Sequence, residues 1–188
     1  MKKMNSEQFF PRYFETLSKT TDSVSVADLK VVAQMIWKAH HAGKKVIIVG
    51  NGGSAAIASH VAVDLTKAAS IRAVNFNEAD LLTCLANDYG YAKWVEKALE
   101  FWADPGDLAI TISSSGNSAN IVKGARQAKL LGLGLITLSG FDPNNPLRQL
   151  GDLNLWADSD QYNIVETTHQ TWLLSIVDYL IESGNMEL

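Results

Sequence analysis

Two short loops rich in glycine and serine carry the groups best suited to bind an anion. They are Gly50–Ser54, which reads GNGGS, and Ser113–Ser118, which reads SSSGNS. Glycines permit positive φ and close backbone approach, and serine hydroxyls at a helix start lie beside unpaired N–H groups that attract phosphate. Alternatively, the glycines serve the turns and the serines cap the helices. Because two such loops occur, we favour phosphate binding. The contacts expected are Gly52, Gly53, Ser113, Ser114, Ser115 and Ser118.

Two pairs of titratable side chains have helical spacing. His60 and Asp64 are four residues apart, and Glu166 and His169 are three apart, so each pair projects from one helix face. Such pairs could supply a general acid and base, or a divalent metal site with imidazole and carboxylate ligands. The alternative is a solvated face without chemistry. Asn87 and Asp88 offer further polar ligands, or form only an Asx turn.

Nucleotide binding is disfavoured by what accompanies the first loop. Gly50, Gly52 and Ala55 fit the G-x-G-x-x-G/A dinucleotide pattern. That pattern requires an acidic residue about 20 residues later to hold the ribose, and Asn75 and Asn77 stand there instead. The Gly-Lys-Ser/Thr of a P-loop is absent from the sequence.

Alternating elements must position these loops. Short β-branched or apolar runs alternate with helical periodicity, which predicts a parallel sheet covered by helices on both faces, an α/β fold. Each loop then follows a buried strand and opens a helix, where ligands bind in open α/β folds. The predicted strands are 45–49, 71–76, 108–112, 133–138 and 153–157; the predicted helices lie near 9–17, 29–39, 54–67, 78–86, 91–101, 117–131 and 163–181.

Composition bounds the class of protein. The 188 residues are 47% hydrophobic, carry a net charge of -4 and include one cysteine, Cys84. This predicts one globular domain without disulfides or a cysteine-rich zinc module. Phosphate-backbone binding to nucleic acid is not expected, because acidic residues outnumber basic ones. Without a signal peptide or a run of about 20 apolar residues, the sequence predicts no membrane association and a cytoplasmic location.

Three segments resemble a known family. GNGGSAAIASHVAVDL, LANDYGYAKWVEKALE and ITISSSGNSANIVKGARQAKLLGLGLITLSG are similar to the sugar isomerase (SIS) domain, and most similar to its phosphoheptose isomerases. The resemblance implies a flavodoxin-like three-layer sandwich with a five-stranded parallel sheet plus N-terminal helices. We expect a single SIS domain over 1–188, with a helical segment at 1–43 and the α/β core at 44–188. It also implies a homotetramer with sites shared between subunits, and zinc as a possible metal.

The same resemblance implies roles for individual residues. Asn51, Ser54 and Asp88 would contact the sugar, His60 would bind metal, and Asp64 stands where the family has a glutamate base. Glu166 replaces a family glutamine, so it would contact the substrate or join His60 and Asp64 as a metal ligand. The family's second catalytic histidine falls on Leu174, which has no ionisable group. We therefore expect His169 to be the proton donor on that helix.

The activity implied is aldose–ketose isomerisation of a phosphorylated sugar, most specifically sedoheptulose 7-phosphate. A carboxylate would move a proton between neighbouring carbons through an enediol, and a second group would stabilise the oxyanion. The alternative is a non-catalytic member that binds a phosphosugar or a partner protein, as the DnaA initiator-associating protein does. Leu174 and Asp64 favour the alternative, and the intact sugar-contact motifs favour the enzyme.

Overall fold

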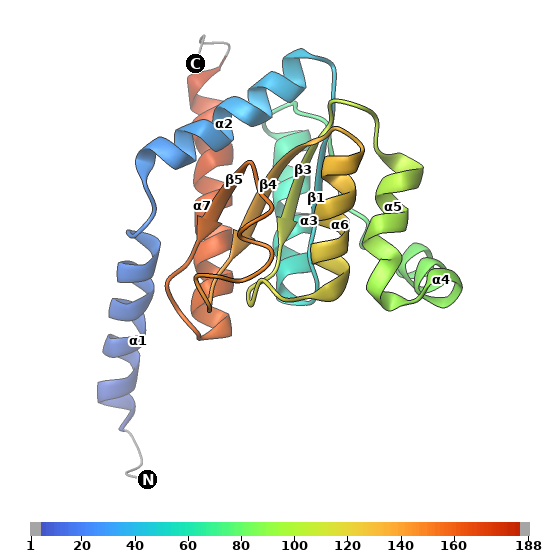
Figure 1. The fold of residues 1–188 in the computed structure, drawn as a ribbon. Coiled ribbons are helices and arrows are strands. Elements are labelled where there is room, and N and C mark those ends of the chain that lie inside the picture. The colour runs from blue at the N-terminus through green and yellow to red at the C-terminus, as the bar shows by residue number, and fades with distance from the viewer. Residues whose placement is uncertain (1–4, 185–188) are drawn as a thin grey trace.

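Strands and helices alternate along the chain, as Figure 1 shows for the computed structural model, which describes residues 5–184. The strands are β1 (Val46–Val49), β2 (Ala73–Val74), β3 (Leu108–Ile112), β4 (Gly134–Ser139) and β5 (Leu153–Trp156). The helices are α1 (Ser6–Thr21), α2 (Val26–His41), α3 (Gly53–Lys67), α4 (Ala79–Tyr89), α5 (Trp94–Trp102), α6 (Ala119–Leu130) and α7 (Tyr162–Ser183), with a 3-10 turn, η1 (Tyr91–Lys93), before α5. No helix within these residues is long and apolar enough to cross a membrane.

The five strands form one parallel sheet in the order β2-β1-β3-β4-β5. β1 and β3 lie side by side at its centre, and every residue of both strands is buried. Their β-branched and apolar side chains therefore cover both faces of the sheet, as the sequence predicted. The order reverses between β1 and β3, because β2 lies beyond one of them and β4 beyond the other.

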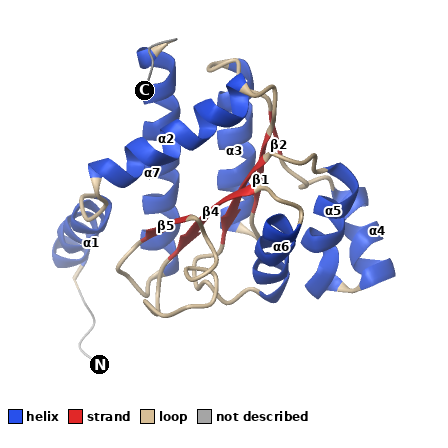
Figure 2. Ribbon diagram, turned by 45° about the horizontal axis from the view of Figure 1, so that its top comes forward, coloured by secondary structure: helices blue, strands red, loops and turns tan. Residues whose placement is uncertain are grey.

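Helices cover both faces of the sheet (Figure 2). On one face α2, α3 and α7 pack on alternate strand residues such as Ile48, Ile110 and Leu138. On the other face the residues between them, such as Ile47 and Ala109, pack against helices α4, α5 and α6. This is the three-layer α/β sandwich that the sequence predicted.

Two element predictions differ from the structure. The apolar stretch 71–76 forms only the two-residue strand β2, since it lies at the sheet edge and pairs with β1 alone. Ile71 and Phe76 are nevertheless buried, beyond the ends of that strand. Asn87 and Asp88 lie in the last turn of α4 rather than in an Asx turn, and α4 ends at Tyr89, just before Gly90, whose φ is +85°.

The N-terminal segment contributes to two different parts of the molecule. α2 belongs to the main fold, because Val32, Ala33 and Ile36 are buried in the same core as the sheet. α1 extends away from the sheet along the start of α7 (Figure 1). Its aromatic side chains Phe10 and Phe14 are 55% and 63% exposed.

Candidate functional site

A polar cavity of about 140 Å³ lies where the strand order reverses. It is formed at the carboxyl ends of β1 and β3, the place where parallel α/β sheets bind ligands. The two loops found in the sequence form most of its wall, and the start of α7 closes it. Its lining residues are Asn51, Ser54, Ile112, Ser113, Ser114, Ser115, Ser118, Tyr162 and Glu166.

The serine loop leaves the start of α6 available to an anion. Ser118 is the N-cap residue of α6, but its side chain makes no capping hydrogen bond with that helix. Instead, the Ser118 hydroxyl oxygen accepts a hydrogen bond from the Ser113 hydroxyl over 3.1 Å. The first N–H groups of α6 therefore lack a side-chain acceptor, and the alternative that the serines serve only as caps does not describe Ser118.

The glycine loop opens the start of α3 in the same way. Gly52, the N-cap residue of α3, has no side chain to accept a hydrogen bond, and its φ of +54° is strained for other residues. Two helix N-termini thus begin at one cavity, each without a side-chain cap. Each contributes a partial positive charge, which favours a bound anion.

The amide of Asn51 is held in one orientation. It exchanges two hydrogen bonds, of 2.9 and 2.8 Å, with the buried amide of Asn120. The Tyr91 hydroxyl donates a third, of 3.1 Å, to Asn51 Oδ1. Oδ1 then has two donors, while Nδ2 uses only one of its two hydrogens. Asn51 consequently offers the cavity a hydrogen-bond donor.

Glu166 brings the only carboxylate among the residues that line this cavity. Its Oε1 accepts a hydrogen bond of 3.2 Å from the Ser114 hydroxyl. The carboxylate lies directly against Gly53, where an added Cβ would overlap both carboxylate oxygens. The glycine loop after β1, the serine loop after β3 and α7 therefore meet at this side chain.

His60 and Asp64 lie outside that cavity, further along α3. His60 Nε2 is 3.2 Å from Asp64 Oδ2, and Gln170 Nε2 is 3.1 Å from His60 Nδ1. If the Gln170 amide donates to Nδ1, Nε2 carries the proton and donates to Asp64. The predicted pair is therefore formed, and about half of the His60 side chain and a third of the Asp64 side chain are exposed.

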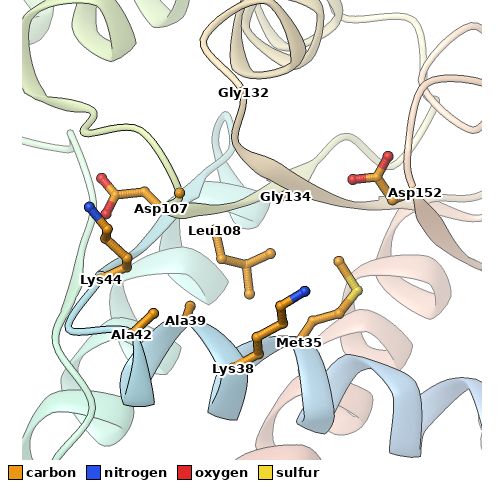
Figure 3. A pocket seen from close by; sticks show the side chains of 11 residues that line it. Met35, Lys38, Ala39, Ala42, Lys44, Asp107, Leu108, Gly132, Gly134 and Asp152 are labelled. Carbon is orange, nitrogen blue, oxygen red and sulfur yellow. The ribbon is translucent and has the colours of Figure 1, made fainter.

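A larger cavity lies at the opposite ends of the strands, where β3 and β4 begin, beside α2 (Figure 3). It measures about 440 Å³, and Met35, Leu108 and the lysines Lys38 and Lys44 are among its lining residues. None of the residues predicted for catalysis or ligand binding lines it. Size alone therefore does not identify the functional site.

Comparisons with known proteins show the family of this chain. The SIS domain family matches residues 8–140. A phosphoheptose isomerase of Fusobacterium nucleatum is 35% identical over 181 residues, 93% of each chain. A probable phosphoheptose isomerase of Thermoplasma acidophilum is 33% identical over 85% of this chain and 91% of its own. This chain belongs to the SIS domain family. Its relatives place it among the phosphoheptose isomerases of that family.

A solved member has the same fold. The structure of a phosphoheptose isomerase from Francisella tularensis superposes with a TM-score of 0.87 and covers 96% of this chain and 100% of its own. At 23% sequence identity, this likeness supports the fold of the family and no more. It agrees with the predicted flavodoxin-like SIS architecture.

The environment of His169 does not fit the proton donor expected at the missing family histidine. His169 is fully buried, does not line the cavity, and its Nε2 lies 3.0 Å from the carbonyl oxygen of Ser139. Burial lowers the pKa of His169 to about 4, with the Ser139 contact acting in the opposite direction. The ring is therefore neutral near pH 7, and α7 turns it into the core of its own chain; the role of His169 as proton donor stays a prediction.

Leu174, at the position of the family's second catalytic histidine, lies away from the cavity. The helical spacing from Glu166 places both residues on roughly one face, yet Leu174 does not line the cavity. It is partly buried and packs against the hydrophobic core. A cavity confined to the first turn of α7 cannot include a residue two turns further along.

The residues present in one chain do not assemble the zinc site that the family implies. Zinc requires three or four donors around one point. Among residues 5–184, no three His, Cys, Asp or Glu side chains gather closely enough. His60 and Asp64 meet, but both ring nitrogens of His60 already have protein partners, and Glu166 lies in the cavity. Zinc remains a prediction.

Asn87 and Asp88 lie apart from the cavity of their own chain. Both are exposed on α4, and Asn87 Nδ2 donates to Asp88 Oδ1 over 2.9 Å. The structure thus brings together Asn51, Ser54, the serine loop and Glu166, while Gly52 and Gly53 form the adjoining helix start. It does not bring Asn87, Asp88, His60, Asp64 or His169 into this cavity.

Two contributors were missed by the sequence reasoning. Tyr162 lines the cavity from the first residue of α7, a position that no motif marks. Asn145, in the segment FDPNNP between β4 and β5, is 1% exposed and donates to Ser139 Oγ and to the carbonyl oxygens of Gly140 and Asp142. Its side chain occupies the space that a Cβ at Gly116 would need. The run of turn-forming residues gave no sign of this burial.

Proposed function

We propose that this protein is an aldose–ketose isomerase that interconverts sedoheptulose 7-phosphate and the corresponding heptose 7-phosphate. The curated relatives, named phosphoheptose isomerases at 33–35% identity, support this choice of substrate. The site supports it independently, because it combines an anion-binding region with a carboxylate. Isomerisation needs both a held phosphate and a base.

One observation carries the proposal: α3 and α6 both begin at the same serine-lined cavity without side-chain caps. The phosphate group would bind the hydroxyls of Ser115 and Ser118 and the first N–H groups of α6. Asn51 would donate to a sugar oxygen through its free amide hydrogen. The reacting carbons would then lie beside Glu166, on the side of the cavity away from α6.

The oligomer that we propose is a homotetramer. α1 lies along α7 and away from the sheet (Figure 1). The exposed side chains of Phe10 and Phe14 on α1 leave apolar surface that a second copy could cover. His60 and Asp64, which lie outside their own chain's cavity, would be available to a neighbouring subunit. Sites shared between subunits are part of this proposal.

Two further assignments belong to the same proposal. We place the enzyme in the cytoplasm, which agrees with a single cysteine, Cys84, that is exposed and free. Zinc would require donors from more than one subunit, because one chain supplies only the His60 and Asp64 pair. No step of the reaction is assigned to the metal.

The deciding experiment is turnover of sedoheptulose 7-phosphate by the purified full chain. Product is followed by NMR, with and without added zinc and with a chelator in a third arm. We expect the aldose phosphate to appear. Binding of the substrate by calorimetry, without turnover under any of the three conditions, would contradict an enzyme and favour the non-catalytic phosphosugar-binding alternative.

A further inference from the structure

Glu166 is placed differently from every other acid considered for the reaction. Within the part of the chain that the structure describes, it is the only carboxylate that lines the serine-loop cavity, and it is partly buried there. Among residues 5–184, no Lys, Arg or His lies within 4 Å of its carboxylate to form an ion pair. Its negative charge is therefore not used to hold the fold together through a salt bridge.

The two carboxylate oxygens of Glu166 have different surroundings. Oε1 accepts the hydrogen bond from Ser114, whose side chain is 5% exposed. Oε2 has no hydrogen-bond partner within the part of the chain that the structure describes. It lies against Gly53, where the missing side chain leaves room for it. One oxygen is thus held, and the other is available to accept a proton.

The other candidate bases are less well placed within the chain. Asp64 Oδ2 already contacts His60, and Asp64 does not line the cavity. His169 is fully buried with its Nε2 at the Ser139 carbonyl. A base must come within about 3 Å of the proton that it removes. Only Glu166 meets a ligand in the cavity of its own chain.

We propose that Glu166 is the general base of the isomerisation, a proposal that rests on the isomerase function proposed above. In the ketose, Oε2 removes a proton from C1, and the C–H electron pair becomes the second bond between C1 and C2. The C2 oxygen takes a proton from solvent, which gives the enediol. The C1 hydroxyl then returns a proton to solvent, C2 takes the proton from Glu166, and the aldehyde forms at C1.

Ser114 and Gly53 are the positioning residues for this base. The Ser114 hydroxyl fixes the rotation of the carboxylate, and the bare α-carbon of Gly53 lets it come close to the start of α3. A Ser114→Ala change removes only the hydroxyl. It should lower kcat more than it raises KM, because it leaves the phosphate contacts at α6 in place.

The test measures incorporation of solvent deuterium at C1 of sedoheptulose 7-phosphate, together with binding of the same sugar phosphate by calorimetry. Glu166→Gln keeps the size of the side chain and removes its basicity. We expect deuterium incorporation to fall by about 100-fold or more, within the usual contribution of a general base, with the Kd changed by less than about threefold. Glu166→Ala, which leaves a space, should regain part of the exchange when formate is added.

Three results would overturn the assignment. The first is exchange in Glu166→Gln within tenfold of the wild-type rate. The second is a rise in Kd of more than tenfold in that variant, which would make Glu166 a binding residue. The third is formate rescue of Asp64→Ala without rescue of Glu166→Ala. If the wild-type chain itself shows neither exchange nor turnover, the proposed function fails rather than the choice of base.

Discussion

A single buried imidazole makes the stability of this protein depend on pH. The pKa of His169 is lowered from 6.5 to about 4 by burial, so the unfolded chain binds a proton more readily than the folded one. The folded state is therefore favoured above pH 6.5, and this contribution is lost as the pH falls from 6.5 towards 4. The difference between the two pKa values corresponds to about 3 kcal/mol at most.

The measurement is urea unfolding at pH 7.5 and pH 5 for the wild type and for His169→Gln. Glutamine has no group that titrates here and can still donate to the Ser139 carbonyl oxygen. We expect the wild type to lose more stability than His169→Gln between the two pH values. Equal losses in the two proteins would show that His169 is not the cause.

The amide pair of Asn51 and Asn120 leads to a second prediction for single residues. Asn120→Leu removes both amide bonds to Asn51, while Tyr91→Phe removes one. We expect the Kd for the sugar phosphate to rise about tenfold in Asn120→Leu and less in Tyr91→Phe, because hydrogen bonds contribute about 1 kcal/mol each. Calorimetry with sugar phosphate and with inorganic phosphate makes the comparison, and an equal loss for both ligands would count against the role given to Asn51.

At the scale of elements, the start of α6 carries the phosphate prediction. The Ser118 hydroxyl makes no capping hydrogen bond with α6, so Ser118→Ala should leave the stability of the helix unchanged. The bound phosphate, in contrast, should lose a hydrogen bond. Hydrogen bonds to charged groups are worth about 1.5–3 kcal/mol, so inorganic phosphate should bind about tenfold more weakly or worse. Ser175→Ala, on the exposed side of α7, is the control. Unchanged phosphate affinity in Ser118→Ala would remove phosphate from this loop.

The elements that the sequence predicted best are those whose environment is uniform. β1 and β3 are buried on both faces, and a short continuous run of apolar residues is the sequence pattern that predicts such a strand. The length of β2 was overestimated, because a strand at the edge of a sheet pairs with a single neighbouring strand. α7 carries apolar residues around much of its circumference, so helical spacing did not reveal that His169 faces the core and Glu166 the cavity.

At the scale of the whole molecule, the exposed aromatic side chains of α1 carry the prediction about assembly. Phe10→Ser with Phe14→Ser should convert a tetramer into smaller species, since each exposed ring could contribute about 1.5–3 kcal/mol when buried. Light scattering during size-exclusion chromatography gives the mass. Phe101→Ser, which changes a ring 58% exposed on α5, controls for the loss of apolar surface in general. A monomeric wild type, or no change in the double variant, would contradict the assembly that we propose.

The part of the site that the sequence predicted is the part that depends only on short segments of the chain. Each serine or glycine loop follows its own strand and opens its own helix, so short segments were sufficient to place Ser54 and Ser118 at one edge of the sheet. The positions of Glu166, Tyr162 and Asn145 depend on how distant segments meet. Spacing paired Asp64 with His60, and only the resemblance gave Asp64 the role of the base. Spacing along one helix gives a shared face, but it does not say which cavity that face reaches.

The contact between Gly53 and Glu166 also constrains how this family can diverge. A methyl group at position 53 would require the Glu166 carboxylate to move, because in the present arrangement the two would occupy the same space. Substitutions at these positions should therefore be coupled in evolution. We expect descendants that shorten residue 166 to vary more at residue 53 than descendants that keep the carboxylate. An alignment of close homologues would reveal this pairing as covariation.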